Sequence, residues 1–308
     1  MDNIFFLFFC LFLGLLLQQV KSLPQNMPST LGGLILYVPL PALCLLSIPD
    51  LEWKLSLVPL GLVAWIVFGL AYFFFTFLGK KYSWEKELVG CLILTGGFCN
   101  SAFVGFPVIE ALYGKEALKS AIFLDQAGSF LIASSFGIWV ATHFSAGVVQ
   151  KKFLVKKIIF FPPFMAFLAA IIMSFLDVRP TGLIREFLEK LVALLTPLAL
   201  ITVGLQLKWT KLRENISFLA LGLFFKLLFA PLVIFVLYYF LGAEKLVVNI
   251  AVMESGMATM ITASILASTH KLRPELSSMM VGVGVPFSFL TLSFLYFLLE
   301  MVSNKVLH

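Results

Sequence analysis

The residues best suited to chemistry lie in the apolar stretch that runs from Cys99 to Pro107. This stretch combines two short polar side chains, Asn100 and Ser101, with the helix breakers Gly105 and Pro107. Proline lacks a backbone N–H and clashes with the carbonyl one turn before it, so the stretch predicts an interrupted helix. Open amides at such an interruption, with the partial positive charge of a helix N-terminus, are suited to bind a carboxylate. The alternative is a proline kink that serves packing alone.

A second polar run, from Glu254 to Met257, lies in another apolar stretch and includes Ser255 and Gly256. A carboxylate at the centre of a membrane span costs at least about 2.5–3.5 kcal/mol on insertion scales, so it should face a partner or an interior cavity. Glu254 could therefore bind a coupled proton or cation, line part of a substrate cavity, form a structural ion pair, or remain a neutral hydrogen-bonded acid.

Two further ionisable residues, Asp125 and Lys226, lie inside apolar stretches. Asp125 follows the same argument as Glu254, although it lies nearer the end of its stretch. Lys226 could pair with Asp125 or Glu254, contact an anionic substrate, or extend its long side chain to the membrane surface. The sequence leaves these three interpretations of Lys226 open.

Composition places these residues in a membrane protein. Hydrophobic residues make up 61% of the 308 residues and charged residues 12%, whereas soluble domains contain about 25% charged residues. The formal net charge of +6 does not indicate nucleic-acid binding, because Lys and Arg lie in short connections between apolar stretches, where they set membrane orientation. Protease, lipase and P-loop motifs are absent from the sequence, so we expect no enzyme, no cofactor and no metal site.

Ten stretches are long and apolar enough for membrane helices, which need about 20 residues each. They are residues 4–20, 31–48, 55–78, 88–113, 118–142, 153–176, 189–207, 216–241, 246–268 and 276–301. The connections around residues 80–86 and 150–157 are rich in Lys. We therefore expect these connections on the inner side of the membrane and both termini outside.

The basic connection near residue 150 divides the chain into two sets of five predicted helices, residues 1–150 and 151–308. Five helices per half give the halves opposite orientations in the membrane, which is the inverted-repeat arrangement of many secondary transporters. Pro41 in the first half matches Pro197 in the second, and Pro107 matches the run that ends at Ala258. The sequence thus predicts one all-α integral membrane unit built from two inverted repeats.

The order and spacing of several short motifs resemble the auxin efflux carrier family, which includes the plant PIN carriers and bacterial malate or malonate permeases. The motifs span nearly the whole chain: Pro41-Ala42-Leu43, Asn100 to Pro107, Tyr113-Gly114, Asp125, Thr196-Pro197-Leu198-Ala199-Leu200, Lys226 with Pro231, and Glu254 with Met257. The resemblance implies that the fourth and ninth of ten helices are broken and cross at the substrate site. It also implies a scaffold domain around the second and seventh helices, often dimeric, and an elevator-like transport domain.

Carried over by position, the resemblance assigns Asn100, Gly105 and Pro107 to the first crossover and Glu254, Gly256 and Met257 to the second. Asp125 would support the site. The family usually places proline directly after this methionine, where the present chain has Ala258. Because Ala is the best helix former, we expect the ninth helix to be less interrupted than the family pattern demands.

We therefore expect a secondary or potential-driven carrier of a small organic anion, such as a carboxylate, in the plasma (inner) membrane. Candidate partners besides the anion and the lipid bilayer are H+ or Na+ as coupling ion and a second copy of the chain. One alternative is a sodium- or proton-coupled symporter or antiporter on a related ten-helix fold, although the acidic residues here are single and separated. A more distant alternative is a non-transporting membrane sensor or an intramembrane enzyme.

Overall fold

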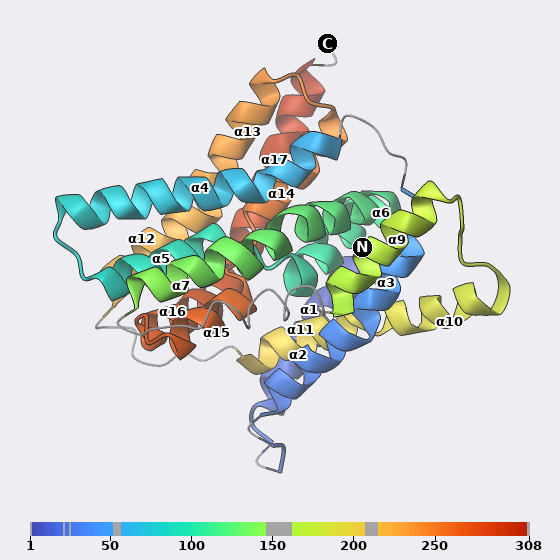
Figure 1. Cartoon of the computed structure of the whole chain (residues 1–308), viewed down its shortest axis with the longest axis horizontal. Helices are drawn as coiled ribbons and strands as arrows, with labels where there is room; N and C mark the ends of the chain where they lie inside the picture. Colours follow the sequence, from blue (N-terminus) through green and yellow to red (C-terminus); the bar gives the residue numbers. More distant parts are fainter. Residues whose placement is uncertain are drawn as a thin grey trace. The chain divides into compact units, whose positions relative to one another are not determined.

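The computed structural model describes residues 2–20, 22–24, 26–51, 57–145, 162–206 and 215–306. Within these ranges the regular secondary structure consists of helices (Figure 1) and one isolated β-bridge. The all-helical prediction is confirmed for this part of the chain.

The chain divides into two compact units. Unit 1 comprises residues 1–54, 102–126 and 150–207, and unit 2 comprises residues 55–101, 127–149 and 208–308. Each unit thus takes segments from both predicted repeats. The predicted halves, residues 1–150 and 151–308, are repeats along the sequence and not compact units in space. They stay a prediction.

The helices of unit 1 are α1 (Asp2–Leu17), α2 (Met27–Tyr37), α3 (Pro39–Ser47), α6 (Phe106–Leu124), α9 (Pro162–Phe175), α10 (Gly182–Ala193) and α11 (Leu195–Gln206). The helices of unit 2 are α4 (Leu57–Lys81), α5 (Lys86–Gly97), α7 (Ile138–Phe144), α12 (Ile216–Phe224), α13 (Ala230–Phe240), α14 (Lys245–Ser255), α15 (Ile261–Thr269), α16 (Pro274–Gly282) and α17 (Gly284–Val306). π-Helical turns are η1 (Ser101–Gly105), η2 (Asp125–Phe130), η3 (Ala133–Gly137) and η4 (Phe225–Phe229).

Six helical stretches of the described residues are long and apolar enough to cross a membrane: Thr30–Ser47, Leu57–Lys81, Ser101–Phe144, Gly182–Leu205, Ile216–Phe240 and Gly284–Val302. Two shorter apolar helices are Phe5–Leu17 and Pro162–Phe175. The prediction of an integral membrane protein is supported at this level, whereas the number of ten spans stays a prediction.

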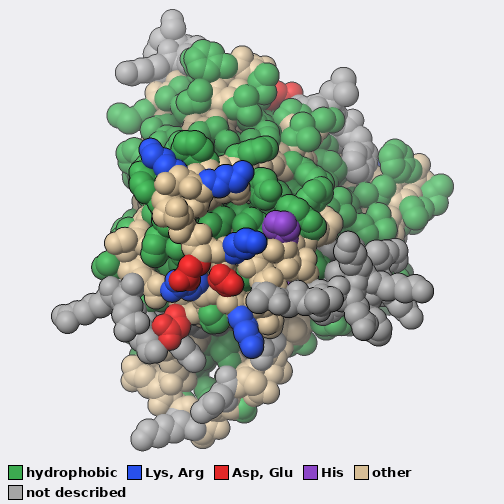
Figure 2. All heavy atoms as spheres, turned by 60° about the vertical axis from the view of Figure 1, so that its left-hand side comes forward, with side chains coloured by type: hydrophobic (Ala, Val, Ile, Leu, Met, Phe, Trp, Pro, Cys, Tyr) green, Lys and Arg blue, Asp and Glu red, His purple; other side chains and the backbone are tan. Residues whose placement is uncertain are grey.

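The exposed surface fits a lipid environment. Large hydrophobic side chains such as Phe73, Phe240 and Phe297 are more than half exposed. On the face drawn in Figure 2 hydrophobic side chains are widespread, and most of the visible charged side chains gather in one small region. Soluble monomers rarely expose apolar surface on this scale.

Prolines mark two interruptions within unit 1. α2 and α3 meet at Val38, and Pro39 opens α3, where a missing N–H costs nothing. α10 and α11 meet at Leu194, shortly before Pro197. The two prolines that the sequence paired, Pro41 and Pro197, therefore each lie in the first turn of a helix that follows a break.

Gly114 turns the chain inside α6. Its φ of 82° and ψ of −179° belong to a region that only glycine occupies readily. The sequence predicted the fourth span to end at residue 113 and the fifth to begin at residue 118. The turn at Gly114 lies between these two boundaries.

The backbones of α1 and α11 in unit 1 lie against each other at Gly14 and Gly204, and glycine makes that approach possible. A methyl group added at Gly14 would lie 2.8 Å from Gly204 Cα and closer still to the Ile201 carbonyl oxygen. Gln18 Nε2 also donates to the Gly204 carbonyl oxygen at 2.6 Å. Small residues that let backbones approach in this way are a common basis of helix association in membranes.

We predict that Gly14→Ala and Gly204→Ala each destabilise unit 1, because the new methyl groups meet backbone atoms that cannot rotate away. Overpacking of this kind costs about 1–3 kcal/mol, so both variants should melt several degrees lower in detergent. Gly33→Ala in α2 is the control, since its methyl group would find nothing within 4 Å. Equal melting temperatures for all three variants would contradict the close approach.

Candidate functional site

Two interrupted helices of unit 2 meet at their breaks. α5 ends at Gly97 and α14 ends at Ser255, and α15 begins only at Ile261. Between these ends the two extended segments pair: Cys99 and Thr259 form an isolated antiparallel bridge. We call residues 98–101 and 256–260 together the crossing.

Main-chain hydrogen bonds hold the crossing together. The Asn100 N–H donates to the Ala258 carbonyl oxygen at 2.9 Å, and the Met260 N–H donates to the Phe98 carbonyl oxygen at 3.2 Å. Each break thereby supplies partners for backbone groups that the other break releases. This reciprocity meets the requirement that backbone groups within a bilayer be paired inside the protein.

Threonine side chains complete the pairing at the end of α5. The Thr259 hydroxyl donates to the Thr95 carbonyl oxygen at 2.8 Å, across the crossing. The Thr95 hydroxyl in turn donates to the Cys91 carbonyl oxygen, also at 2.8 Å. Sequence reasoning missed Thr95, because only the folded chain brings its carbonyl to the second break.

The position of the first break differs from the sequence interpretation. Phe98, not Pro107, is the first non-helical residue after α5, with φ −118° and ψ 139°. Pro107 is the second residue of α6 and follows the π-helical turn η1 without a gap, so its missing N–H loosens a continuing helix and does not end it. The expectation that Pro107 itself breaks the helix is therefore corrected, and Gly105 directly precedes the start of α6.

The second break is complete although Ala258 replaces the proline of the family pattern. Asn100 bonds to the Ala258 carbonyl, so tertiary pairing holds this segment extended against the helix propensity of alanine. Gly256 packs tightly, since a methyl group there would lie 2.8 Å from Leu295 Cδ1. The expectation of a less interrupted ninth helix is wrong for this structure.

Asn100 and Ser101 bring two buried polar side chains to the crossing. Asn100 is 1% exposed and Ser101 is fully buried. Asn100 Nδ2 and Ser101 Oγ have no hydrogen-bond partner among the described residues. Two buried polar groups are therefore available at the crossing.

The N-terminus of α15 also opens at the crossing. Met260 precedes it and gives no side-chain cap. The first N–H groups of a helix have no partner within the helix, and they carry part of the positive end of its dipole. The neutral donors of residues 98–101 and the positive end of α15 thus belong to the two paired segments of the crossing.

The other predicted residues of the second break lie at the end of α14. Glu254 and Met257 are fully buried, and the Met257 N–H donates to the Glu254 carbonyl oxygen at 3.2 Å. Lys226, from η4, places its Nζ 3.1 Å from the Ser255 carbonyl oxygen and 2.9 Å from Cys99 Sγ. Unit 2 thus brings together Asn100, Ser101, Lys226, Glu254, Gly256 and Met257.

Gly105, Pro107 and Asp125 belong to unit 1. Asp125 is 3% exposed, and its Oδ2 accepts a hydrogen bond from Gln126 Nε2 at 2.9 Å. Asp125 opens the π-helical turn η2 directly after α6.

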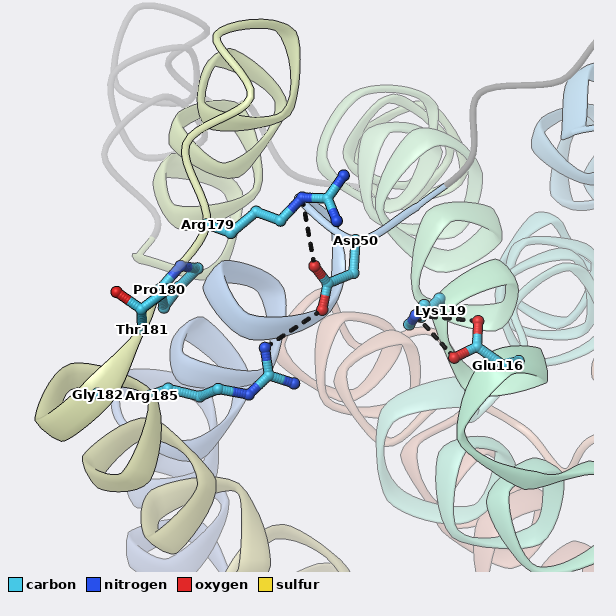
Figure 3. Close-up of a pocket in the computed structure, with 8 residues that line it drawn as sticks. All are labelled: Asp50, Glu116, Lys119, Arg179, Pro180, Thr181, Gly182 and Arg185. Atoms are coloured by element: carbon cyan, nitrogen blue, oxygen red, sulfur yellow. Dashed lines mark hydrogen bonds and ion pairs between the residues drawn. The ribbon is translucent and has the colours of Figure 1, made fainter.

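Unit 1 contains a separate polar cavity of about 710 Å³ near the α9–α10 connection. Figure 3 shows Asp50 between Arg179 and Arg185, at 3.8 and 3.6 Å, and Lys119 paired with Glu116 at 2.8 Å. Arg179 and Arg185 also pair with Asp177 and Glu189. Each base of the cavity lining is thus paired with an acid, and the ion pairs of Asp50 connect Arg179 and Arg185 to the residues that follow α3.

The chain resembles known membrane transport proteins over nearly its full length. A family model described as membrane transport protein matches residues 1–296, which include both breaks of the crossing. An uncharacterized transporter of Methanothermobacter thermautotrophicus is 28% identical over 282 residues, which cover 91% of this chain and 92% of that protein. An uncharacterized transporter of Methanocaldococcus jannaschii is 25% identical over 305 residues, covering 95% of this chain and 96% of that protein.

We predict that Thr259→Val weakens the crossing, because it leaves the Thr95 carbonyl without its hydroxyl donor. An unsatisfied buried acceptor costs about 1–3 kcal/mol, so the melting temperature in detergent should fall by several degrees. Thr262→Val, three residues further along in α15, is the matched control, since the Thr262 side chain is exposed. If both variants melt like the original protein, the hydroxyl bridge does not stabilise the crossing.

Proposed function

The chain belongs to the membrane transport protein family, the auxin efflux carrier family that its motifs resemble, and we propose that it carries a small organic anion bearing a carboxylate. Transport by alternating access between two inverted five-helix halves is part of this proposal. The family supports the transport function, and the crossing supports the class of substrate.

The spare donors of the crossing carry the proposal. Asn100 Nδ2 and Ser101 Oγ are buried without hydrogen-bond partners among the described residues. A buried donor without a partner costs about 1–3 kcal/mol. Native proteins keep such groups chiefly where they serve a function. A carboxylate has two oxygens that accept hydrogen bonds only, so it matches an amide donor and a hydroxyl donor side by side.

The uncapped start of α15 adds to this match. The N–H groups at the start of α15 can donate hydrogen bonds to an anion, and the positive end of the helix dipole stabilises its charge. Secondary transporters commonly point the N-terminus of a half-helix at the anionic group of a substrate. We propose that Asn100, Ser101 and the α15 N-terminus bind the carboxylate, and that Gly256 and Met257 shape the adjoining wall.

The antiparallel meeting of two broken helices is what two inverted halves would produce. The breaks before Pro41 and Pro197 fit the same repeat. We therefore keep the proposal of ten spans, both termini outside, in the plasma (inner) membrane. Gly105, Pro107 and Asp125, which follow the first break along the chain, are proposed as supporting residues, and Glu254 as the group that handles a coupled proton if one is carried.

We predict that Asn100→Ala lowers the transport of labelled mono- and dicarboxylates into proteoliposomes by about tenfold or more, the equivalent of one hydrogen bond to a charged group. Asn100→Asp should lower it further, because it places like charge against the anion. Since Asn100 Nδ2 makes no hydrogen bond in the described structure and the backbone bond to Ala258 does not depend on the side chain, the melting temperature of Asn100→Ala should stay near that of the original protein.

Ser264→Ala is the matched control within unit 2. Ser264 Oγ contacts the carbonyl oxygen and the hydroxyl of Ser277 at 2.9 and 2.8 Å. This variant should melt at a lower temperature and yet transport normally per folded molecule. Unchanged transport by Asn100→Ala, or a parallel loss of stability and transport, would refute the assignment of Asn100 to the substrate site.

A further inference from the structure

The polar cavity of unit 1 lies where apolar helical stretches begin and end. Asp50 shortly follows the stretch Thr30–Ser47, and Thr181 directly precedes the stretch Gly182–Leu205. The residues just beyond a membrane span lie among the lipid headgroups. The cavity also takes Glu116 from the connection after the fourth predicted span. The proposed topology puts this connection and those around Asp50 and Thr181 on one side of the membrane, so the cavity lies at the level of one headgroup layer.

The lining of the cavity contains more bases than acids. Its three bases are Lys119, Arg179 and Arg185, and its two acids are Asp50 and Glu116. Because Lys119 pairs with Glu116, the two arginines share the single carboxylate of Asp50, one on each side of it (Figure 3). Their nitrogens lie 3.8 and 3.6 Å from its oxygens, farther than the roughly 2.7–2.9 Å of a charge-assisted hydrogen bond. Asp50 therefore neutralises only part of the charge of the arginine pair.

The other acidic partners of the two arginines lie at the protein surface. Asp177 contacts Arg179 at 3.3 Å, and Glu189 contacts Arg185 at 3.0 Å. The side chains of Asp177 and Glu189 are 85% and 51% exposed. Surface ion pairs contribute little, because water and salt screen them. Among the described residues the Arg185 guanidinium makes one hydrogen bond, from Nε to Glu189, so most of its five N–H donors are available to a ligand.

The start of α10 adds backbone donors at the same cavity. Thr181 and Gly182 line it, and the Thr181 side chain does not cap the helix. Gly182 has a φ of 52°, and a methyl group there would find nothing within 4 Å. The first N–H groups of a helix have no partner within it and form the positive end of its dipole. Two guanidinium groups beside a helix N-terminus are the chemistry that binds phosphate.

Exposed apolar side chains adjoin these charged residues along the chain. Leu183, Ile184 and Phe187 of α10 and Leu176, directly after α9, are each more than half exposed. No residue of α10 is buried. Its apolar residues alternate with charged ones such as Arg185 at helical spacing, which is typical of a helix at a membrane interface. A soluble phosphate ester needs only the charged groups, whereas a phospholipid also needs apolar surface beside them.

We propose that this cavity binds the phosphate headgroup of an anionic phospholipid. Arg179, Arg185 and the start of α10 bind the phosphate, and the exposed apolar side chains of α10 lie along the acyl chains. A lipid bound in this way connects the α9–α10 connection to the residues that follow α3 and so stabilises unit 1. The inference does not depend on the proposed transport function, because the donors proposed to bind the transported anion belong to unit 2.

Lipid titration of the purified full-length protein in a neutral detergent tests the proposal. Phosphatidylglycerol should raise the melting temperature by several degrees, and native mass spectrometry should show the lipid retained on the protein. Phosphatidylcholine with the same acyl chains should do so much less, since its choline group brings positive charge to the arginines. Inorganic phosphate should also have little effect, because it lacks acyl chains. An effect of either one equal to that of phosphatidylglycerol would overturn the assignment to an anionic lipid.

Two substitutions in α10 form a matched pair, because each removes one positive charge. Arg185→Gln should weaken the binding of phosphatidylglycerol by about tenfold or more, the equivalent of one hydrogen bond to a charged group. Lys190→Gln should leave it nearly unchanged, since Lys190 is exposed and lies outside the cavity lining. Arg179→Gln replaces Arg185→Gln if that variant does not fold.

Asp50→Asn should change lipid binding in the opposite direction. It removes the carboxylate that competes with the phosphate for the two arginines, so phosphatidylglycerol should bind more tightly than to the original protein. The inference is overturned if Arg185→Gln and Lys190→Gln bind the lipid equally, or if Asp50→Asn binds it more weakly. None of these measurements involves transport, so failure of every tested carboxylate to be carried would refute the proposed function and leave the lipid site standing.

Discussion

The structure of unit 2 depends on one constraint, the need to pair backbone groups where a helix is broken among buried residues. Residues 98–101 and 256–260 meet this need for each other, through the bridge between Cys99 and Thr259 and the main-chain bonds beside it. Neither break could exist alone in these buried surroundings, since each backbone N–H or carbonyl left without a partner would cost several kcal/mol. Because main-chain groups of the two segments pair with each other, Asn100 Nδ2 and Ser101 Oγ are not used to satisfy the backbone. The proposed substrate site is therefore a consequence of how the backbone is satisfied.

The two helix ends at the crossing are satisfied by different chemistry. α5 is met by the neutral hydroxyl of Thr259, whereas α14 is met by the ammonium group of Lys226. Inverted repeats would place equivalent helix ends here, but their partners differ in charge. The end of α5 therefore has a neutral partner. The end of α14 combines the negative end of a helix dipole with two buried ionisable side chains, Glu254 and Lys226. The two ends of the crossing therefore differ in their charged groups, a difference that an exact repeat of the two halves would not produce.

The sequence predicts the helical membrane class, the two interrupted segments and most residues of the crossing, because these follow from local composition and from motif order. It does not predict which groups pair, since the Thr259 hydroxyl and the Thr95 carbonyl are 164 positions apart. Pro107 was misinterpreted because a proline is compatible both with a broken helix and with a π-helical turn inside a continuing one. Ala258 shows the limit of propensity, because hydrogen bonds across the crossing outweigh the few tenths of a kcal/mol by which residues differ in helix preference. The contact of Gly14 with Gly204 is likewise invisible to local patterns.

The division of tasks at the crossing also bears on how a substrate could leave. A carrier must bind its substrate well enough to select it and weakly enough to release it on the other side. A hydrogen bond from a neutral donor to a charged group contributes about 1.5–3 kcal/mol, whereas separation of a buried ion pair costs about 3–5 kcal/mol. If Lys226 bound the carboxylate directly, a buried ion pair would have to break in a dry environment at every cycle. Because its Nζ is bonded to the Ser255 carbonyl, Lys226 is engaged within the protein, and the proposed site leaves the contacts that form and break to the neutral donors of Asn100 and Ser101.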